Sequence, residues 1–146
     1  VRRQRARLSM RGSVAAGPWA RLDTASATLA GLAGRIGGPA EAAVLEAAVA
    51  ERGLREVAQR VMAVERALRF APADSKPALA EAHRALADEL TEGVTAYERL
   101  VAAAAGYVAE DGRSATDNPA TARLAEAADM LRHVAAGLAE LRALRT

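Results

Sequence analysis

The sequence of 146 residues contains no cysteine, and this absence removes several kinds of function at once. The chain can form neither a disulfide nor a thiolate metal site, and it has no thiol nucleophile. Only two histidines are present, His83 and His133, so a metal site built from several histidines is also excluded. We expect the protein to hold neither a metal nor another cofactor.

Aromatic residues are scarce, since one Trp, one Phe and two Tyr make up 3% of the chain. β-Domains normally need more aromatic and β-branched side chains to cover a pleated sheet. The chain is instead rich in Ala, Leu, Arg and Glu, which are strong helix formers. Composition therefore predicts an all-α protein, and the length is sufficient for one domain with a sizeable core.

Long hydrophobic runs are absent as well. The longest, Leu100–Val108, is mostly alanine, whereas a helix that crosses a bilayer needs about 20 apolar residues. The chain begins with Val1 rather than Met, and we interpret it as a piece of a longer protein. If a transmembrane segment precedes Val1, we expect this domain at the cytoplasmic face of the membrane, and otherwise in the cytoplasm.

Positive charge is concentrated at the start of the chain. The first eleven residues hold five arginines and no acid, which leaves 15 basic against 18 acidic residues for the remainder. These arginines are Arg2, Arg3, Arg5, Arg7 and Arg11. We interpret residues 1–16 as a basic, flexible arm. It is either a plain tail or the end of a linker, or a segment held near anionic lipid headgroups, where each Arg contributes about 1 kcal/mol.

Nucleic acid is the alternative target of this arm, because phosphate binding requires only Lys or Arg. Single-stranded nucleic acid is usually held by aromatic side chains that stack on the bases, and none is interleaved with these arginines. We therefore rank lipid above nucleic acid.

Residues 17–146 carry the spacing of a helical bundle. We expect a shorter first helix from Gly17 to about Ile36, and long helices over residues 39–69, 77–112 and 119–145. In the three long helices apolar residues recur at alternating steps of three and four, which is typical of coiled-coil packing. The connections are short, so neighbouring helices should be antiparallel. The sequence thus predicts an elongated antiparallel bundle of three long helices plus one shorter N-terminal helix.

The helix over residues 77–112 is expected at the centre of a three-stranded bundle, and its apolar stripe is interrupted at Gly93 and Tyr97. One interpretation is that Gly93 makes room for a bulky residue of a facing helix. The other is a groove whose aromatic rim accepts a partner helix, with Gly93, Tyr97 and Tyr107 as the contact residues.

No catalytic motif is present. Di-iron bundles need Glu-x-x-His motifs that face inward, and none occurs here. The glycines form no phosphate-binding loop, and the serines lack a His/Asp constellation. We predict that the protein is not an enzyme.

The run LADELTEGVTAYERLVAAAAGYVAE, residues 86–110, resembles the C-terminal cytoplasmic domain of the actinobacterial PspM-like phage-shock (envelope-stress) family. The upstream stretches RLDTASATLAGLAGRI and VERALR are similar to that family too. The resemblance extends over most of residues 11–146. In the third-helix run it rests on Leu90, Glu92, Gly93, Tyr97, Leu100 and Val101.

This resemblance implies a non-enzymatic domain that follows transmembrane helices and couples the membrane to PspA, a coiled-coil stress effector. The arginine-rich arm would then be a cytoplasmic juxtamembrane segment, in keeping with the positive-inside tendency. The alternative is a soluble regulatory or nucleoid-associated bundle whose arm contacts nucleic acid. Self-association of the bundle is compatible with either interpretation.

Overall fold

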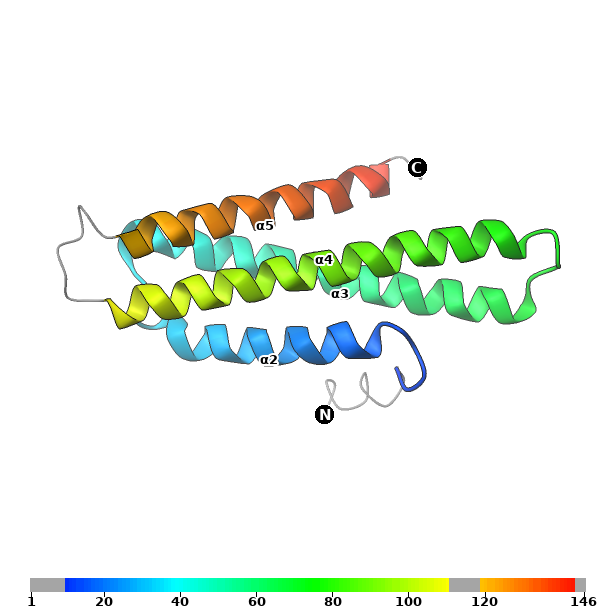
Figure 1. Cartoon of the computed structure of the whole chain (residues 1–146), viewed down its shortest axis with the longest axis horizontal. Coiled ribbons are helices and arrows are strands. Elements are labelled where there is room, and N and C mark those ends of the chain that lie inside the picture. Colours follow the sequence, from blue (N-terminus) through cyan, green and yellow to red (C-terminus); the bar gives the residue numbers. More distant parts are fainter. Residues whose placement is uncertain (1–9, 111–118, 144–146) are drawn as a thin grey trace.

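The computed structural model describes residues 10–110 and 119–143, and every regular element in this part of the chain is helical. The elements are α2 (Ala16–Ala33), the short 3-10 turn η1 (Gly38–Ala40), α3 (Glu41–Phe70), α4 (Lys76–Ala109) and α5 (Pro119–Ala143). Each helix runs antiparallel to the one before it, and together they form an elongated bundle (Figure 1). The prediction of an all-α fold is confirmed.

The lengths of these helices differ in part from the expected three long and one short. α4 has 34 residues and α3 has 30, whereas α5 has 25 and α2 has 18. α2 ends at Ala33 rather than near Ile36. The bundle therefore consists of two long helices, α3 and α4, and two shorter ones, α2 and α5.

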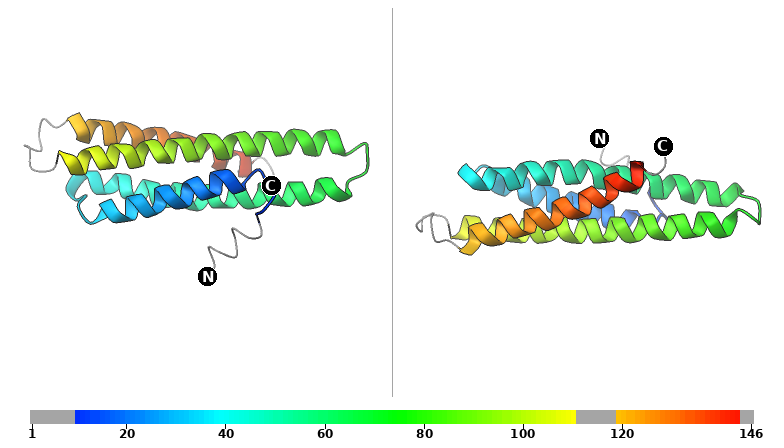
Figure 2. Two further views of the ribbon diagram at one scale, coloured as in Figure 1. Left: turned by 60° about the horizontal axis from the view of Figure 1, so that its bottom comes forward. Right: turned by 90° about the horizontal axis from the view of Figure 1, so that it is seen from above.

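α3 and α4 share the centre of the bundle. Both α2 and α5 pack against each of them, but α2 and α5 make no contact with one another in the described part of the chain. They lie on opposite sides of the central pair (Figures 1 and 2). The helix over residues 77–112 was expected at the centre, and α4 does pack against α2, α3 and α5. It shares this position with α3, which also packs against the other three helices.

The core follows the predicted apolar spacing only in part, because Leu45 and Val49 of α3 are 66% and 65% exposed while Ala43, Ala47 and Ala50 are buried instead. In α4 the buried residues run from Leu86 to Ala104, and in α3 from Ala43 to Val61. α5 contributes Leu124 and Leu131, which are 2% and 1% exposed. The side chains of Leu138, Leu141 and Arg145, which continue the predicted stripe of the last helix, lie outside the described residues.

Local sequence explains where two of the helices begin. Gly38, with φ +64°, adopts the left-handed backbone that turns the chain from α2 into α3, and glycine adopts it without steric cost. Pro77 lies in the first turn of α4, where its missing N–H is no loss. Ser75 holds the N-cap position of α4, but its side chain makes no capping hydrogen bond.

Candidate interaction surfaces

Gly93 lies where α3, α4 and α5 come together. A Cβ atom at this position would overlap Leu54 Cδ2 of α3 and would lie 3.5 Å from Val134 Cγ1 of α5. The residue is buried. Packing against Leu54 therefore accounts for glycine at this position, as the first of the two interpretations expects.

Tyr97 is buried one turn further along α4, with 2% of its surface exposed. It is one of the residues that line a groove of about 430 Å³, together with residues of α2 and α3. Burial raises the pKa of its hydroxyl, and the nearby carboxylate of Glu51 acts in the same direction. Tyr107 is half-buried against the core near the end of α4. The three residues thus form no exposed aromatic rim, and their role in binding a partner stays a prediction.

The first helix is held by a cluster of charges that the sequence did not reveal. Arg55 of α3 reaches Asp23 of α2, with 2.9 Å between Nη2 and Oδ1, and Asp23 is only 5% exposed. The Arg55 guanidinium also lies 4.5 Å from the centre of the Trp19 ring, and its Nε is 3.4 Å from Glu51 Oε2. Such a cation–π contact adds to the burial of Leu22 and Leu29 that attaches α2.

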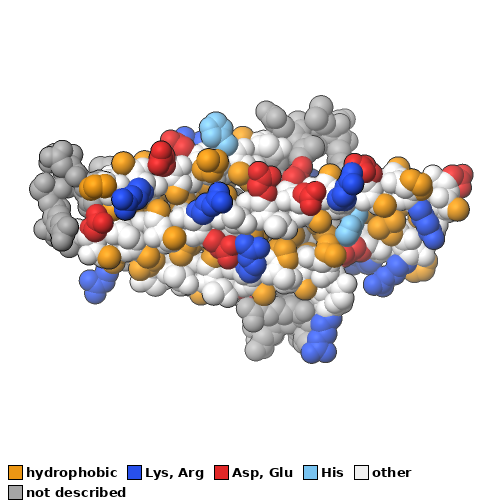
Figure 3. Space-filling model, viewed as in Figure 1, with side chains coloured by type: hydrophobic (Ala, Val, Ile, Leu, Met, Phe, Trp, Pro, Cys, Tyr) orange, Lys and Arg blue, Asp and Glu red, His pale blue; other side chains and the backbone are white. Residues whose placement is uncertain are grey.

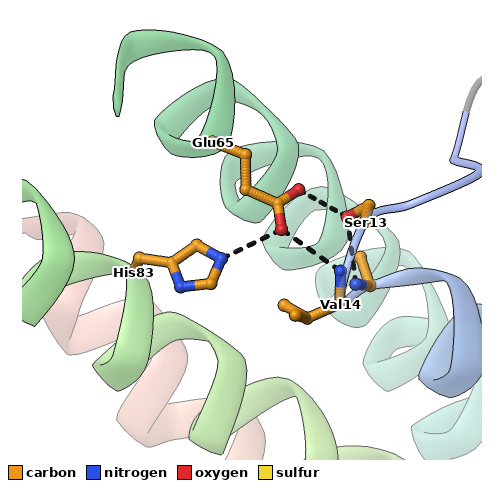
Figure 4. Close-up of polar contacts among 5 residues, drawn as sticks. Ser13, Val14, Glu65 and His83 are labelled. Atoms are coloured by element: carbon orange, nitrogen blue, oxygen red, sulfur yellow. Dashed lines mark hydrogen bonds and ion pairs between the residues drawn. The ribbon is translucent and has the colours of Figure 1, made fainter. Parts of the chain in front are cut away.

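Glu65 of α3 fixes the beginning of the described chain (Figure 4). Ser13 Oγ donates a hydrogen bond to its Oε1 at 2.5 Å, and the Val14 backbone N–H donates to Oε2 at 3.1 Å. His83 Nε2 of α4 lies 3.0 Å from the same Oε2. We call this group of four residues the Glu65 latch.

The Glu65 latch shows that the last part of the expected basic arm is attached to the bundle. Met10 is 2% exposed and belongs to the core, and Ala15 is fully buried. Residues 10–15 therefore pack on the bundle. Arg11 is exposed, whereas the other arginines assigned to lipid or anion contact, Arg2, Arg3, Arg5 and Arg7, lie outside the described residues.

The end of the α3/α4 hairpin is the part of the bundle with the least cover. The last buried residue of α3 is Val61 and the first of α4 is Leu86, and no residue between them is buried. Both helices continue past the ends of α2 and α5 here (Figure 1). Phe70, at the tip, has 87% of its surface exposed. We call residues 62–85 the hairpin tip.

A basic pocket is formed by residues 62–69 of the hairpin tip together with residues 11–13. It has a volume of about 340 Å³ and is lined by Arg11, Arg66 and Arg69 together with Gly12, Ser13, Met62 and Glu65. From the sequence, Arg66 and Arg69 are only part of a charged helix flank. The sequence signal for this pocket is the spacing of three residues between Arg66 and Arg69, which places both side chains on one face of α3.

No group of three or more His, Asp or Glu side chains within residues 10–110 and 119–143 is arranged to hold a metal ion. In the same part of the structure no helix combines the length and the apolar character required to span a membrane.

The fold and these surfaces define an all-α helical bundle whose α3/α4 hairpin extends beyond the two shorter helices. Residues 1–141 match the Rv2743c family, and the chain belongs to that family. No curated protein and no solved structure matches it.

Proposed function

We propose that the protein is a non-enzymatic helical interaction domain of an envelope-stress response of the phage-shock type. In this proposal it binds a coiled-coil partner such as PspA near the membrane. The resemblance of residues 86–110 to PspM-like proteins suggests a role in the phage-shock response. The exposed hairpin tip suggests the surface that binds the partner.

The observation that carries the proposal is the apolar character of the hairpin tip. Val64 and Leu68 of α3 and Leu79 of α4 continue the apolar stripes of the core, yet they are only half-buried. Phe70, two residues after Leu68 at the end of α3, has 87% of its surface exposed. A helix laid along the tip would bury these side chains in the way that α2 and α5 bury the rest of the central pair. Binding of an amphipathic helix in an apolar groove is a common mode of protein recognition.

A charge placed at the tip tests this surface. We expect Phe70→Asp to weaken binding of a purified PspA-type coiled coil by tenfold or more, which corresponds to about 1.4 kcal/mol or more. Leu45→Asp is the matched control, because Leu45 is also an exposed apolar residue of α3, at 66%, but lies near the other end of that helix. Affinity is measured by isothermal titration calorimetry, and circular dichroism verifies that both variants keep their helices.

Equal losses of affinity in the two variants would contradict the assignment of the hairpin tip. Full retention of affinity by Phe70→Asp would do so as well.

A further inference from the structure

We infer that Arg11, Arg66 and Arg69 form a binding site for a phosphate group in the basic pocket. The three side chains come from two segments that are more than 50 residues apart in sequence, and they line one pocket of about 340 Å³. Lys and Arg side chains appear at this end of the molecule, next to the start of the described chain, in the space-filling view (Figure 3).

The charge balance of the pocket favours an anion. Three guanidinium groups line it, against one carboxylate, that of Glu65. Both oxygens of this carboxylate are already engaged, Oε1 by Ser13 and Oε2 by Val14 and His83. Within residues 10–110 and 119–143, none of the three arginines forms an ion pair with an acidic side chain.

Arginine suits a phosphate group for geometric reasons. Its planar guanidinium presents N–H groups in a fork that matches two oxygens of one phosphate, and it remains charged at all physiological pH values. Arg66 and Arg69 lie three residues apart and therefore project from the same face of α3. Both are exposed, so a ligand can reach them from solvent.

The Glu65 latch positions Arg11 in the same pocket as Arg66 and Arg69. The latch binds Ser13 and Val14 to α3, and Gly12, with φ +86°, makes the tight turn that precedes them. Few residues other than glycine adopt that backbone conformation. The site is thus assembled by the fold and would not exist in an arm detached from the bundle.

A phosphate group can belong to inorganic phosphate or to the headgroup of an anionic lipid. This inference goes beyond the proposed function, because it requires no coiled-coil partner. The two sources are separated by two arms of one experiment on the full chain.

The first arm uses inorganic phosphate at constant ionic strength, followed by NMR through the backbone amides of Gly12 and Ser13. We expect saturable shifts, and at least about tenfold weaker binding for the double variant Arg66→Gln/Arg69→Gln, since each charge-assisted bond to an anion is strong. Arg99→Gln/Arg123→Gln is the control, because both residues are exposed, line no part of this pocket and remove the same charge.

The second arm measures sedimentation with phosphatidylcholine vesicles with and without phosphatidylglycerol. A larger loss of binding to the phosphatidylglycerol vesicles in Arg66→Gln/Arg69→Gln than in the control assigns the site to the lipid headgroup. Binding of inorganic phosphate with equal vesicle binding by both variants assigns it to soluble phosphate. The inference is overturned if neither probe distinguishes the two double variants.

Discussion

Gly93 shows how one residue without a side chain determines the spacing of three helices. Leu54 of α3 occupies the space that a Cβ would need, and Val134 Cγ1 of α5 would lie 3.5 Å from it. The sequence revealed that Gly93 interrupts the stripe of α4, but not which helix fills the gap. The facing residue depends on the relative register of α3 and α4, and a repeat of apolar residues every three or four positions leaves that register open.

Replacement of Gly93 by a large residue should destabilise the bundle. We expect Gly93→Leu to lower the free energy of unfolding by about 1–3 kcal/mol, because the side chain overpacks a filled core. Gly106→Leu, in the same helix, is the control. Nothing lies within 4 Å of a Cβ at Gly106, so the better helix propensity of Leu should stabilise the protein by about 0.5–1 kcal/mol. Urea denaturation measures both values, and equal changes in the two variants would refute the packing explanation.

At the scale of the element, the helices themselves were the most predictable part of the structure. α4 was expected over residues 77–112 and occurs at Lys76–Ala109, because Pro77 and a long apolar stripe define it. Contacts between elements were much less predictable. Asp23, Arg55 and Glu65 look like ordinary charged residues of solvated faces, and only the folded chain brings them to their partners.

We expect the attachment of residues 10–14 to α3 to depend on pH, because Glu65 accepts the hydrogen bonds that hold them. Burial raises the pKa of its carboxyl, but hydrogen bonds from Ser13, His83 and Val14 outweigh that effect and lower the pKa below its ordinary value of 4.5. The ionised form is therefore the one that the folded state favours. Its contribution is complete above pH 4.5 and is lost as the pH falls through the lowered pKa.

Hydrogen exchange of the Val14 amide, relative to the intrinsic rate at each pH, measures this effect. We expect protection to decrease in acid, and Glu65→Gln to reduce it several-fold already at neutral pH, because a neutral amide is a weaker acceptor than a carboxylate. Glu81→Gln is the control, since Glu81 is exposed and bonds Arg84 of its own helix. Protection of Val14 that is unaffected by both acid and Glu65→Gln would show that the Glu65 latch does not hold this segment.

At the scale of the whole molecule, unequal helix lengths produce the surface that we assign to function. α3 and α4 have 30 and 34 residues, while α2 and α5 have 18 and 25, so the shorter helices cover only part of the central pair. The sequence predicted an elongated antiparallel bundle, and one of its two interpretations assigned a partner surface to Gly93, Tyr97 and Tyr107, which stays a prediction. Coiled-coil spacing identifies which residues are apolar, and it does not tell which of them remain uncovered.

The most direct test of the account is hydrogen–deuterium exchange of the full chain, with and without a purified PspA-type coiled coil. We predict that binding slows exchange in residues 62–85, the hairpin tip, while the buried stretch of α4 from Leu86 to Ala104 is unchanged. Slower exchange confined to α2 or α5, or no change anywhere in the chain, would contradict the claim that the hairpin tip is the interaction surface.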